Sequence, residues 1–413
     1  MSTEVDWQFQ CSRTTCLPFA TVTVSNIENC QVACLAQVDC QALTFFRSSF
    51  GCELFANISN QNNNLTANMD TVTMIVIDDT RIPLESTTTT TSTTLNTTTI
   101  NPCTLSTYRW NTTGITILNS SQMTFIEDLY FDSDDTLYIS DEYNNDVVWK
   151  LLKNATTATV VAGQRTSYGS GDSQLHNPQG LYLDSKNNMY VADYQNSRIQ
   201  KYVNGSTVGI TIAGVTGSAG SALNQLNIPR DIVIDSTDTY VYIADDNNNR
   251  IIRFQTNSTA GTNGEVVAGG AGAGNTITQL NQPWGIHYLP TISNYLYIIN
   301  YGGHSVMRWI PGNSSGEFIA GIPGTSGSTA TTLSGPTGIK LDSYLNMFVV
   351  DCGNSRVQMF CQNNQTGITI AGTGVSGSSA TQLRGPRGIA FDSSMNLYVA
   401  DTANNRVQKF VKL

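Results

Sequence analysis

The chain has 413 residues, of which 40% are apolar and 13% charged, with 21 Lys and Arg against 31 Asp and Glu and a net charge of -10. At about 150 residues per domain, this length predicts two domains or one domain plus a repeat array. The acidic balance excludes nucleic acid as an expected partner. No apolar run of about 18 residues occurs, so we expect no membrane span.

The N-terminal 85 residues hold six of the nine cysteines, which are Cys11, Cys16, Cys30, Cys34, Cys40 and Cys52. Such a cysteine density indicates an oxidising compartment, so we expect a secreted protein. The start at Met1 lacks a basic segment followed by an apolar core, so the native N-terminus is expected to be longer and to carry the signal. Cys30 and Cys34 face one side of a predicted helix, capped by Ser25 or Asn29.

The segment CQALTFF from Cys40 predicts a strand, with Cys52 on the next one. Together with the C-x3-C-x5-C spacing before it, this pattern resembles the PAN/apple family over about residues 5–80. Members of that family bind proteins or carbohydrates outside cells. The resemblance implies disulfides Cys30–Cys52 and Cys34–Cys40, and we expect Cys11 and Cys16 to pair locally.

Residues 86–102 are predicted to form a linker. From Ser86 to Thr99 the sequence reads STTTTTSTTLNTTT, which has almost no apolar side chains to bury. Tracts of this kind are typical of O-glycosylated stalks. The linker separates a small disulfide-rich α+β domain, residues 1–85, from a body that spans residues 103–413.

The body contains six copies of one pattern. The clearest copy begins NPQGLYLDSKNNMYVADYQNSRIQKY at Asn177. The residues that close its second strand and the corresponding strands recur at intervals of 52, 52, 55, 51 and 50, at Asp141, Asp193, Asp245, Asn300, Asp351 and Asp401. Each copy predicts four short antiparallel strands, and six such sheets predict a mainly β, six-bladed propeller. The last copy lacks a fourth strand, which the segment Gly114–Asn119 is expected to supply.

The recurring P-x-G-[IL]-x-x-D and [YF]-[VI]-A-D-x-x-N-x-R-[IV] elements resemble NHL repeats over residues 114–413. The resemblance implies a propeller that binds partners on one face. Family members work in ubiquitin ligation, RNA binding, sensing and amidation, so the fold does not select a function.

Two sets of residues recur within the copies. The first is predicted to stabilise tight hairpin turns, because carboxylate, amide and guanidinium groups can bond one another and the turn backbone. Its members are Asp193, Asn196 and Arg198; Asp245, Asn248 and Arg250; Asp351, Asn354 and Arg356; and Asp401, Asn404 and Arg406. In the fourth copy the set changes together, to Asn300, Gly303 and Ser305, and in the first copy only the arginine is lost, to Asp146.

The second set is the variable middle residue of P-x-G, which is expected to ring the mouth of the central channel. Its members are Glu127, Gln179, Arg230, Trp284, Thr337 and Arg387. Two arginines and a tryptophan could bind an anionic or sugar-like ligand. The alternative is that this position is unconstrained surface.

Asparagine sequons recur at the turn between the third and fourth strands. They are Asn111, Asn154, Asn204, Asn257, Asn313 and Asn364, with further acceptors at Asn57, Asn64 and Asn96. Glycans there would cover the face opposite the ring and leave the ring face free.

The remaining cysteines are Cys103, Cys352 and Cys361. We expect Cys103 and Cys361 to emerge on one face and to pair. Cys352 falls in a turn on the opposite face and is predicted to be the free thiol.

These features predict an extracellular recognition or adhesion protein that binds protein or carbohydrate, without cofactor, metal or catalytic residues. Only His176, His287 and His304 are present, and they form no close-spaced ligand motif, so the chain is predicted not to be an enzyme. One alternative is a metal-dependent propeller lyase or hydrolase acting on the ring face, and another is a structural matrix component.

Overall fold

The computed structural model of the protein describes residues 46–48, 51–53, 101–105 and 108–413. The chain divides into two units, residues 1–97 and 98–413. In the first unit, β1 (Phe46–Ser48) pairs antiparallel with β2 (Gly51–Glu53), and Arg47 lies opposite Cys52. The predicted helix with Cys30 and Cys34 lies outside the described residues.

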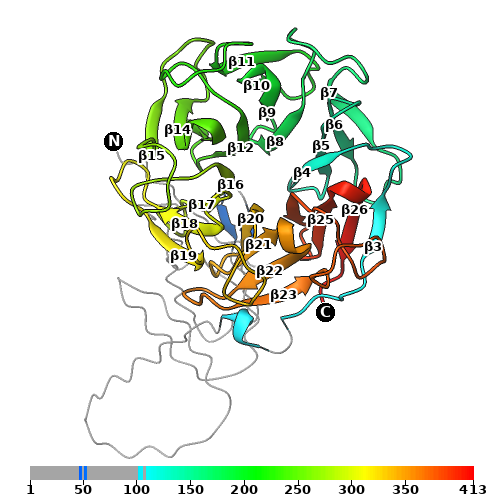
Figure 1. The fold of residues 1–413 in the computed structure, drawn as a ribbon. Helices are drawn as coiled ribbons and strands as arrows, with labels where there is room; N and C mark the ends of the chain where they lie inside the picture. Colours follow the sequence, from blue (N-terminus) through cyan, green and yellow to red (C-terminus); the bar gives the residue numbers. More distant parts are fainter. Residues whose placement is uncertain (1–45, 49–50, 54–100, 106–107) are drawn as a thin grey trace, which may run out of the picture. The chain divides into compact units, whose positions relative to one another are not determined.

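The second unit is a ring of six four-stranded antiparallel sheets, the blades (Figure 1). The predicted fold class, mainly β with a six-bladed propeller, is confirmed. Blades 1 to 3 consist of β4 (Ile126–Phe131), β5 (Leu137–Asp141), β6 (Val147–Leu151) and β7 (Thr159–Gly163); β8 (Pro178–Leu183), β9 (Met189–Asp193), β10 (Arg198–Tyr202) and β11 (Gly209–Gly214); and β12 (Pro229–Ile234), β13 (Tyr240–Asp245), β14 (Arg250–Gln255) and β15 (Glu265–Gly269). Blades 4 to 6 consist of β16 (Pro283–Tyr288), β17 (Leu296–Asn300), β18 (Ser305–Trp309) and β19 (Glu317–Gly321); β20 (Pro336–Leu341), β21 (Met347–Asp351), β22 (Arg356–Phe360) and β23 (Gly367–Ala371); and β24 (Ile389–Phe391), β25 (Leu397–Asp401), β26 (Arg406–Phe410) and β3 (Ile115–Leu118).

Helical structure in the described chain is limited to single turns of 3-10 helix. One of them, η1 (Pro102–Thr104), precedes the closing strand β3. The others connect second and third strands, and they are η2 (Tyr194–Asn196), η3 (Asp246–Asn248), η4 (Cys352–Asn354) and η5 (Thr402–Asn404). Blades 2, 3, 5 and 6 therefore have the same kind of connection between their second and third strands.

The core of the ring is divided among the six seams where neighbouring blades meet face to face. The second strand of a blade is buried on both sides, which is why MYVAD and LYVAD read as nearly continuous apolar runs. In the seam between blades 2 and 3, for example, Tyr190 and Ile199 pack with Ile232 and Phe254. The outermost strands, such as β7 and β11, are partly exposed.

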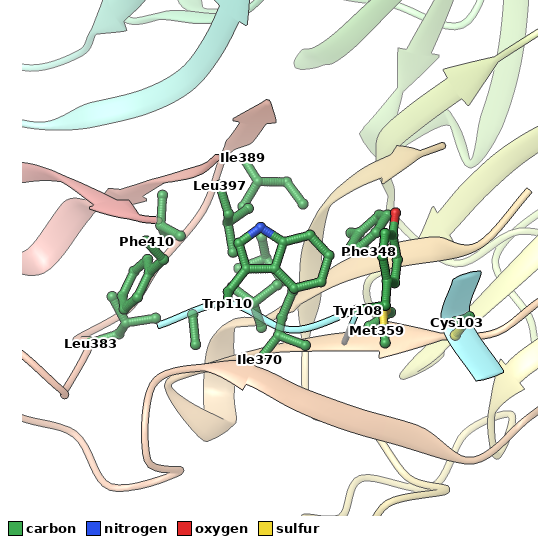
Figure 2. Packing of buried hydrophobic residues seen from close by; sticks show 14 residues of the cluster. Cys103, Tyr108, Trp110, Phe348, Met359, Ile370, Leu383, Ile389, Leu397 and Phe410 are labelled. Atoms are coloured by element: carbon green, nitrogen blue, oxygen red, sulfur yellow. The ribbon is translucent and has the colours of Figure 1, made fainter. Parts of the chain in front are cut away.

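The ring is closed by strand β3, which pairs antiparallel with β26, so that Thr116 lies opposite Gln408. The preceding segment adds contacts that the sequence did not suggest. Trp110 packs against Phe348 of blade 5, and its Nε1 donates to the carbonyl of Met395 in blade 6 at 2.8 Å. Figure 2 shows this indole among Ile389, Leu397 and other residues of one cluster. The hydroxyl of Tyr108 donates to Asp342 at 2.8 Å.

Candidate functional site

The six variable residues of P-x-G line one pocket at the mouth of the central channel, together with Asp128 and Asp231. In blades 1 to 5 the ladder between first and second strands is interrupted where the first strand begins. In blade 2, for example, the register shifts between Pro178 and Leu181. An interruption of this kind redirects the side chains at that point.

In four blades the third residue of P-x-G is a glycine, and there the first strands of neighbouring blades lie very close together. A Cβ atom at Gly285 would lie 2.3 Å from the carbonyl oxygen of Thr337. Two copies replace the glycine by aspartate, and each carboxylate then accepts a backbone N–H from the next blade. Asp128 accepts from Leu181 at 3.2 Å, and Asp231 accepts from Ile286 at 2.8 Å.

Trp284 lies beside two guanidinium groups at the mouth. The Cζ atom of Arg230 is 3.8 Å from the indole centroid, and that of Arg387 is 5.4 Å from it. Arg230 is held in place by Asp246 at 3.0 Å and by the Oε1 atom of Gln179 at 3.0 Å. Its position is therefore set by residues from two blades.

Arg387 contacts two carboxyl groups of blade 1. It donates to Glu127 and lies 3.6 Å from Glu142. Burial raises the pKa of Glu127 well above its usual range, and the charge of Glu142 acts in the same direction, while Arg387 opposes both. The site therefore contains a buried carboxyl pair beside one guanidinium.

The floor of the pocket is also acidic. Burial raises the pKa of Asp231 to about 7, with a further contribution from the charge of Asp128. Burial likewise raises the pKa of Asp128, and Lys340 opposes the shift in both groups. Burial and Lys340 together lower the pKa of His287 to about 3, so that histidine is neutral at physiological pH.

The ring residues differ in accessibility. Glu127, Gln179 and Thr337 are buried, and Thr337 donates to the carbonyl of Arg387 at 3.0 Å. Trp284, Arg230 and Arg387 are partly exposed. Within the described chain, the Nε2 atom of Gln179 has no hydrogen-bond partner. The pocket has a volume of only about 20 Å³, which is room for one water molecule. A larger ligand would therefore lie over the mouth, against the partly exposed side chains.

The residues present do not fit a metal ion. Across residues 101–105 and 108–413, no three His, Cys, Asp or Glu side chains converge as ligands would. His176 stacks on Tyr168 with ring centroids 4.6 Å apart, and His304 accepts from the backbone of Gly335 at 3.0 Å. His287 lies on β16, and neither of its ring nitrogens has a partner among the described residues.

The turn residues form a repeated cluster. In blade 2, Asp193 accepts from Arg198 at 2.7 Å, from Asn196 at 2.9 Å and from the backbone of His176 at 2.8 Å. Arg198 also donates to the carbonyl of Ser170. The cluster therefore joins the second-to-third strand turn to the loop that enters the blade. The same ion pair recurs between Arg250 and Asp245, between Arg356 and Asp351, and between Arg406 and Asp401.

The asparagine of each cluster bonds in two directions. The Nδ2 atom of Asn248 donates to Asp245 and to the carbonyl of Gly220, both at 2.8 Å. That of Asn354 donates to Asp351 and to the carbonyl of Gly327, both at 2.8 Å. That of Asn404 donates to Asp401 and to the carbonyl of Gly377, both at 2.9 Å. Each amide thereby links the turn of its blade to the entering loop.

These residues lie in or beside the short hairpin turn that joins the second and third strands of their blades. Asn196, Asn248, Asn354 and Asn404 each end a turn of 3-10 helix. The residue that follows each of them is left-handed, with φ values of 52°, 51°, 50° and 51°. Asn196 is buried, whereas Asn248, Asn354 and Asn404 are only half-buried.

Blades 1 and 4 depart from this cluster. In blade 1 the turn is one residue longer, since Val147 rather than Asp146 lies opposite Asp141. Asn145 and the Nε1 atom of Trp149 donate to Asp141 at 2.6 and 2.8 Å, so the indole stands in for the missing arginine. The interpretation that only the arginine changes in this copy is therefore corrected.

In blade 4 the cluster is reduced. Asn300 accepts from the backbone of Asn281 at 2.6 Å and donates to Ser305 at 3.4 Å. Gly303 fits here because a Cβ atom would lie 2.1 Å from the Nδ2 atom of Asn300.

Cys103 and Cys361 form a disulfide with Cα atoms 5.6 Å apart. Cys352 is the free cysteine of the described residues, and burial raises the pKa of its thiol to about 11. The pairings expected for Cys11, Cys16, Cys30, Cys34 and Cys40 lie outside the described residues. So do Asn57, Asn64 and Asn96. The six sequon asparagines at the third-to-fourth strand turns, from Asn111 to Asn364, are all exposed.

Several functional candidates were missed from the sequence: Glu142, Asp246, Asp128, Asp231 and Lys340. Asp128 and Asp231 had a visible signal, because each replaces the glycine of P-x-G. Glu142 and Asp246 each follow the aspartate that closes a second strand, and only the folded ring brings them to the mouth.

Comparison with known families agrees with the fold. The PAN domain model matches residues 9–76, and the NHL repeat model matches residues 175–202 and 383–410. The chain thus carries NHL repeats in a six-bladed propeller and a PAN domain at its N-terminus, as predicted. No curated protein matches the chain. No helix among the described residues combines the length and hydropathy of a membrane span.

Solved structures of similar fold include an enzyme and a binding protein. A gluconolactonase from Xanthomonas campestris is 15% identical with a TM-score of 0.52, and the match covers 72% of this chain and 89% of that one. An auxiliary nutrient binding protein from Bacteroides ovatus is 16% identical with a TM-score of 0.54, covering 74% and 77%. The prediction that the chain is not an enzyme is therefore corrected, because a protein of this fold is a gluconolactonase.

Proposed function

We propose that the propeller acts on a small, oxygen-rich molecule by acid–base catalysis at the channel mouth, as a hydrolase or lyase. The observation that carries this proposal is the buried carboxyl pair of Glu127 and Glu142 beside Arg387. A carboxyl group whose pKa is raised can donate a proton near neutral pH, and a second carboxyl group beside it can accept one.

The donors at the mouth suit a substrate rich in oxygen atoms. Arg387 is partly exposed at the mouth, and the buried Nε2 atom of Gln179 has no hydrogen-bond partner among the described residues. An ester or lactone of a sugar acid has the carbonyl and hydroxyl oxygens that such donors bind. The similarity in fold to a gluconolactonase supports this substrate class.

The proposed hydrolysis needs no metal, which agrees with the absence of a ligand set in the described chain. Glu142 would take a proton from a water molecule while the oxygen of that water bonds to the carbonyl carbon of the substrate. Glu127 would give its proton to the departing oxygen, and Arg387 would bind the oxygen that becomes negative.

A test uses the full-length protein, secreted from a eukaryotic host, with a panel of aldonolactones and sugar esters. We expect turnover that falls by about 10²-fold to 10⁴-fold in Glu127→Gln, because the variant lacks the proton donor. Trp284→Ala should raise KM more than it lowers kcat. Glu317→Gln, which changes an exposed carboxylate on β19, serves as the control. Equal rates in Glu127→Gln and the control would contradict the proposal.

We also propose that the protein works outside the cell, where its PAN domain recognises a protein or carbohydrate. The PAN match at residues 9–76 and the disulfide support this location. In the propeller, glycans at the exposed third-to-fourth strand turns would leave the ring face accessible. A glycan array probed with the full chain should give saturable binding, which a purely structural matrix component would not show.

A further inference from the structure

Five of the six seams of the propeller are packed in the same way, with an aromatic side chain over a glycine. In five blades a fully buried aromatic residue, at or one position before the end of the third strand, fills the seam with the preceding blade. These residues are Tyr202, Phe254, Trp309, Phe360 and Phe410. Each lies over a glycine before or at the start of the fourth strand. A Cβ atom at Gly367, for example, would lie 2.9 Å from the ring of Phe360.

Blade 1 breaks this rule at both positions. Leu151 lies opposite Leu137 on the neighbouring strand, as Phe360 lies opposite Met347 in blade 5. The position of the glycine is taken by Ala158, which is buried in the same cluster as Leu151. The seam between blades 6 and 1 therefore has a leucine and an alanine where the other five have an aromatic ring and a glycine.

This substitution coincides with a pocket of about 230 Å³ in that seam, which is open to solvent on one side. Residues of both blades line it, with Ile117 and Tyr398 from blade 6 and Phe131, Leu137 and Leu151 from blade 1. A smaller core side chain leaves a void where its neighbours do not close in. Relative to the Phe and Gly pair of blades 5 and 6, the Leu and Ala pair of blade 1 has two fewer side-chain carbon atoms, so the exchange contributes part of this volume.

The charges at the rim of the cavity are paired. Lys153 lies 2.8 Å from Asp135, and Lys409 lies 3.4 Å from Asp392. The rim therefore carries no net charge and favours neither a cation nor an anion. Phe131 and Tyr398 meet edge to face in the wall, with ring centroids 4.7 Å apart. Another ring can be accommodated against such a surface.

We propose that this seam is a second binding site, specific for a small, uncharged aromatic molecule with one polar substituent, such as a phenol or an indole. The ring would lie against Leu151, Phe131 and Tyr398, and the substituent would reach the rim beside Asp135 and Lys153. Apolar cavities of about 150 Å³ bind benzene, so a volume of 230 Å³ is sufficient for a larger ring. The site lies among the first-to-second and third-to-fourth strand turns, away from the channel mouth, and does not depend on the proposed catalysis.

The chain itself provides the variants for a test. Leu151→Phe with Ala158→Gly installs an aromatic ring over a glycine, as in the other five blades, and should narrow the pocket at Leu151. The reciprocal change, Phe360→Leu with Gly367→Ala, should open an equivalent cavity between blades 4 and 5. Ala155→Leu, which narrows the rim and preserves the Asn154 sequon, is a second blocking variant if the first does not fold.

Binding of indole and phenol to the full-length protein is measured by ligand-observed NMR and calorimetry. The protein is enzymatically deglycosylated first, because Asn154 lines the rim. We expect one saturable site that weakens at least 10-fold in Leu151→Phe with Ala158→Gly and in Ala155→Leu, and a second site in the reciprocal variant. Absence of saturable binding to the unaltered protein, or binding that neither blocking variant weakens, would overturn the proposal.

Discussion

The roles of some single residues could be predicted from the sequence, and those of others could not. Asp193, Asn196 and Arg198 could be assigned to a turn, because their groups complement one another and the nearby backbone. The role of Trp149 could not, since its indole replaces an arginine only through the longer turn of blade 1. The partners of Arg387 were likewise hidden, because Glu127 is 260 residues away along the chain.

Removal of one buried arginine should be costly. In Arg198→Ala the carboxylate of Asp193 stays buried without its charged partner, as side-chain exposures of 1% and 0% show. We expect the free energy of unfolding to fall by about 3 to 5 kcal/mol. The free energy of unfolding is measured by urea titration, with tryptophan fluorescence as the signal. Arg308→Ala, which removes a partly exposed pair with Glu317, should cost at most about 1 kcal/mol. Equal losses in both variants would contradict this reasoning.

At the scale of elements, the repeat period predicted the four-stranded blades because each blade must bury both faces against its neighbours. The closing strand was also predictable, since the last copy lacks a fourth strand. The 3-10 turns that end at Asn248, Asn354 and Asn404 were not, because the loop carbonyls that their amides reach lie 27 or 28 residues earlier in the chain. The contacts of Tyr108 and Trp110 with blades 5 and 6 were also hidden, since they precede the first repeat and match no periodic position.

The disulfide should determine how firmly the closing strand is held. Cys103 precedes β3, and its bond to Cys361 spans 258 residues. Cys103→Ser should lower the free energy of unfolding by about 2 to 5 kcal/mol. Hydrogen exchange of the amides of Ile115–Leu118 should accelerate more than that of β9, where the chain is already paired on both sides. Uniform acceleration throughout the ring would indicate that the disulfide stabilises the whole unit instead.

At the scale of the whole molecule, six seams and a shared axis create buried acids that no local pattern reveals. Asp128 and Asp231 are polar substitutions in a glycine position, and their raised pKa values depend on the closure of the ring around them. The repeats therefore predict the fold, whereas the electrostatics of the site depend on which blades become neighbours.

These acids give a distinct dependence of stability on pH. The folded-state pKa of Asp231 is about 7, above its unfolded value of about 3.9. The folded state therefore holds more protons between these values, and stability falls as pH rises from about 4 to 7. One proton contributes a slope of at most about 1.4 kcal/mol per pH unit.

Thermal unfolding across this pH range measures the effect. In Asp231→Asn the decline should be shallower than in the unaltered protein, although the variant loses one acceptor for a backbone N–H. Asp134→Asn, in an exposed turn, is the control. An unchanged slope in Asp231→Asn would show that other buried carboxyl groups dominate the pH dependence.

The pairing of β3 with β26 also bears on how the chain is made. Thr116 and its partner Gln408 are 292 residues apart. At a synthesis rate of about 5 to 20 residues per second, β3 leaves the ribosome roughly 15 to 60 s before its partner strand exists. During that interval the ring is open and an unpaired strand edge of the nascent chain is accessible to other chains. Aggregation during biosynthesis should therefore depend on the speed at which the last blade is translated.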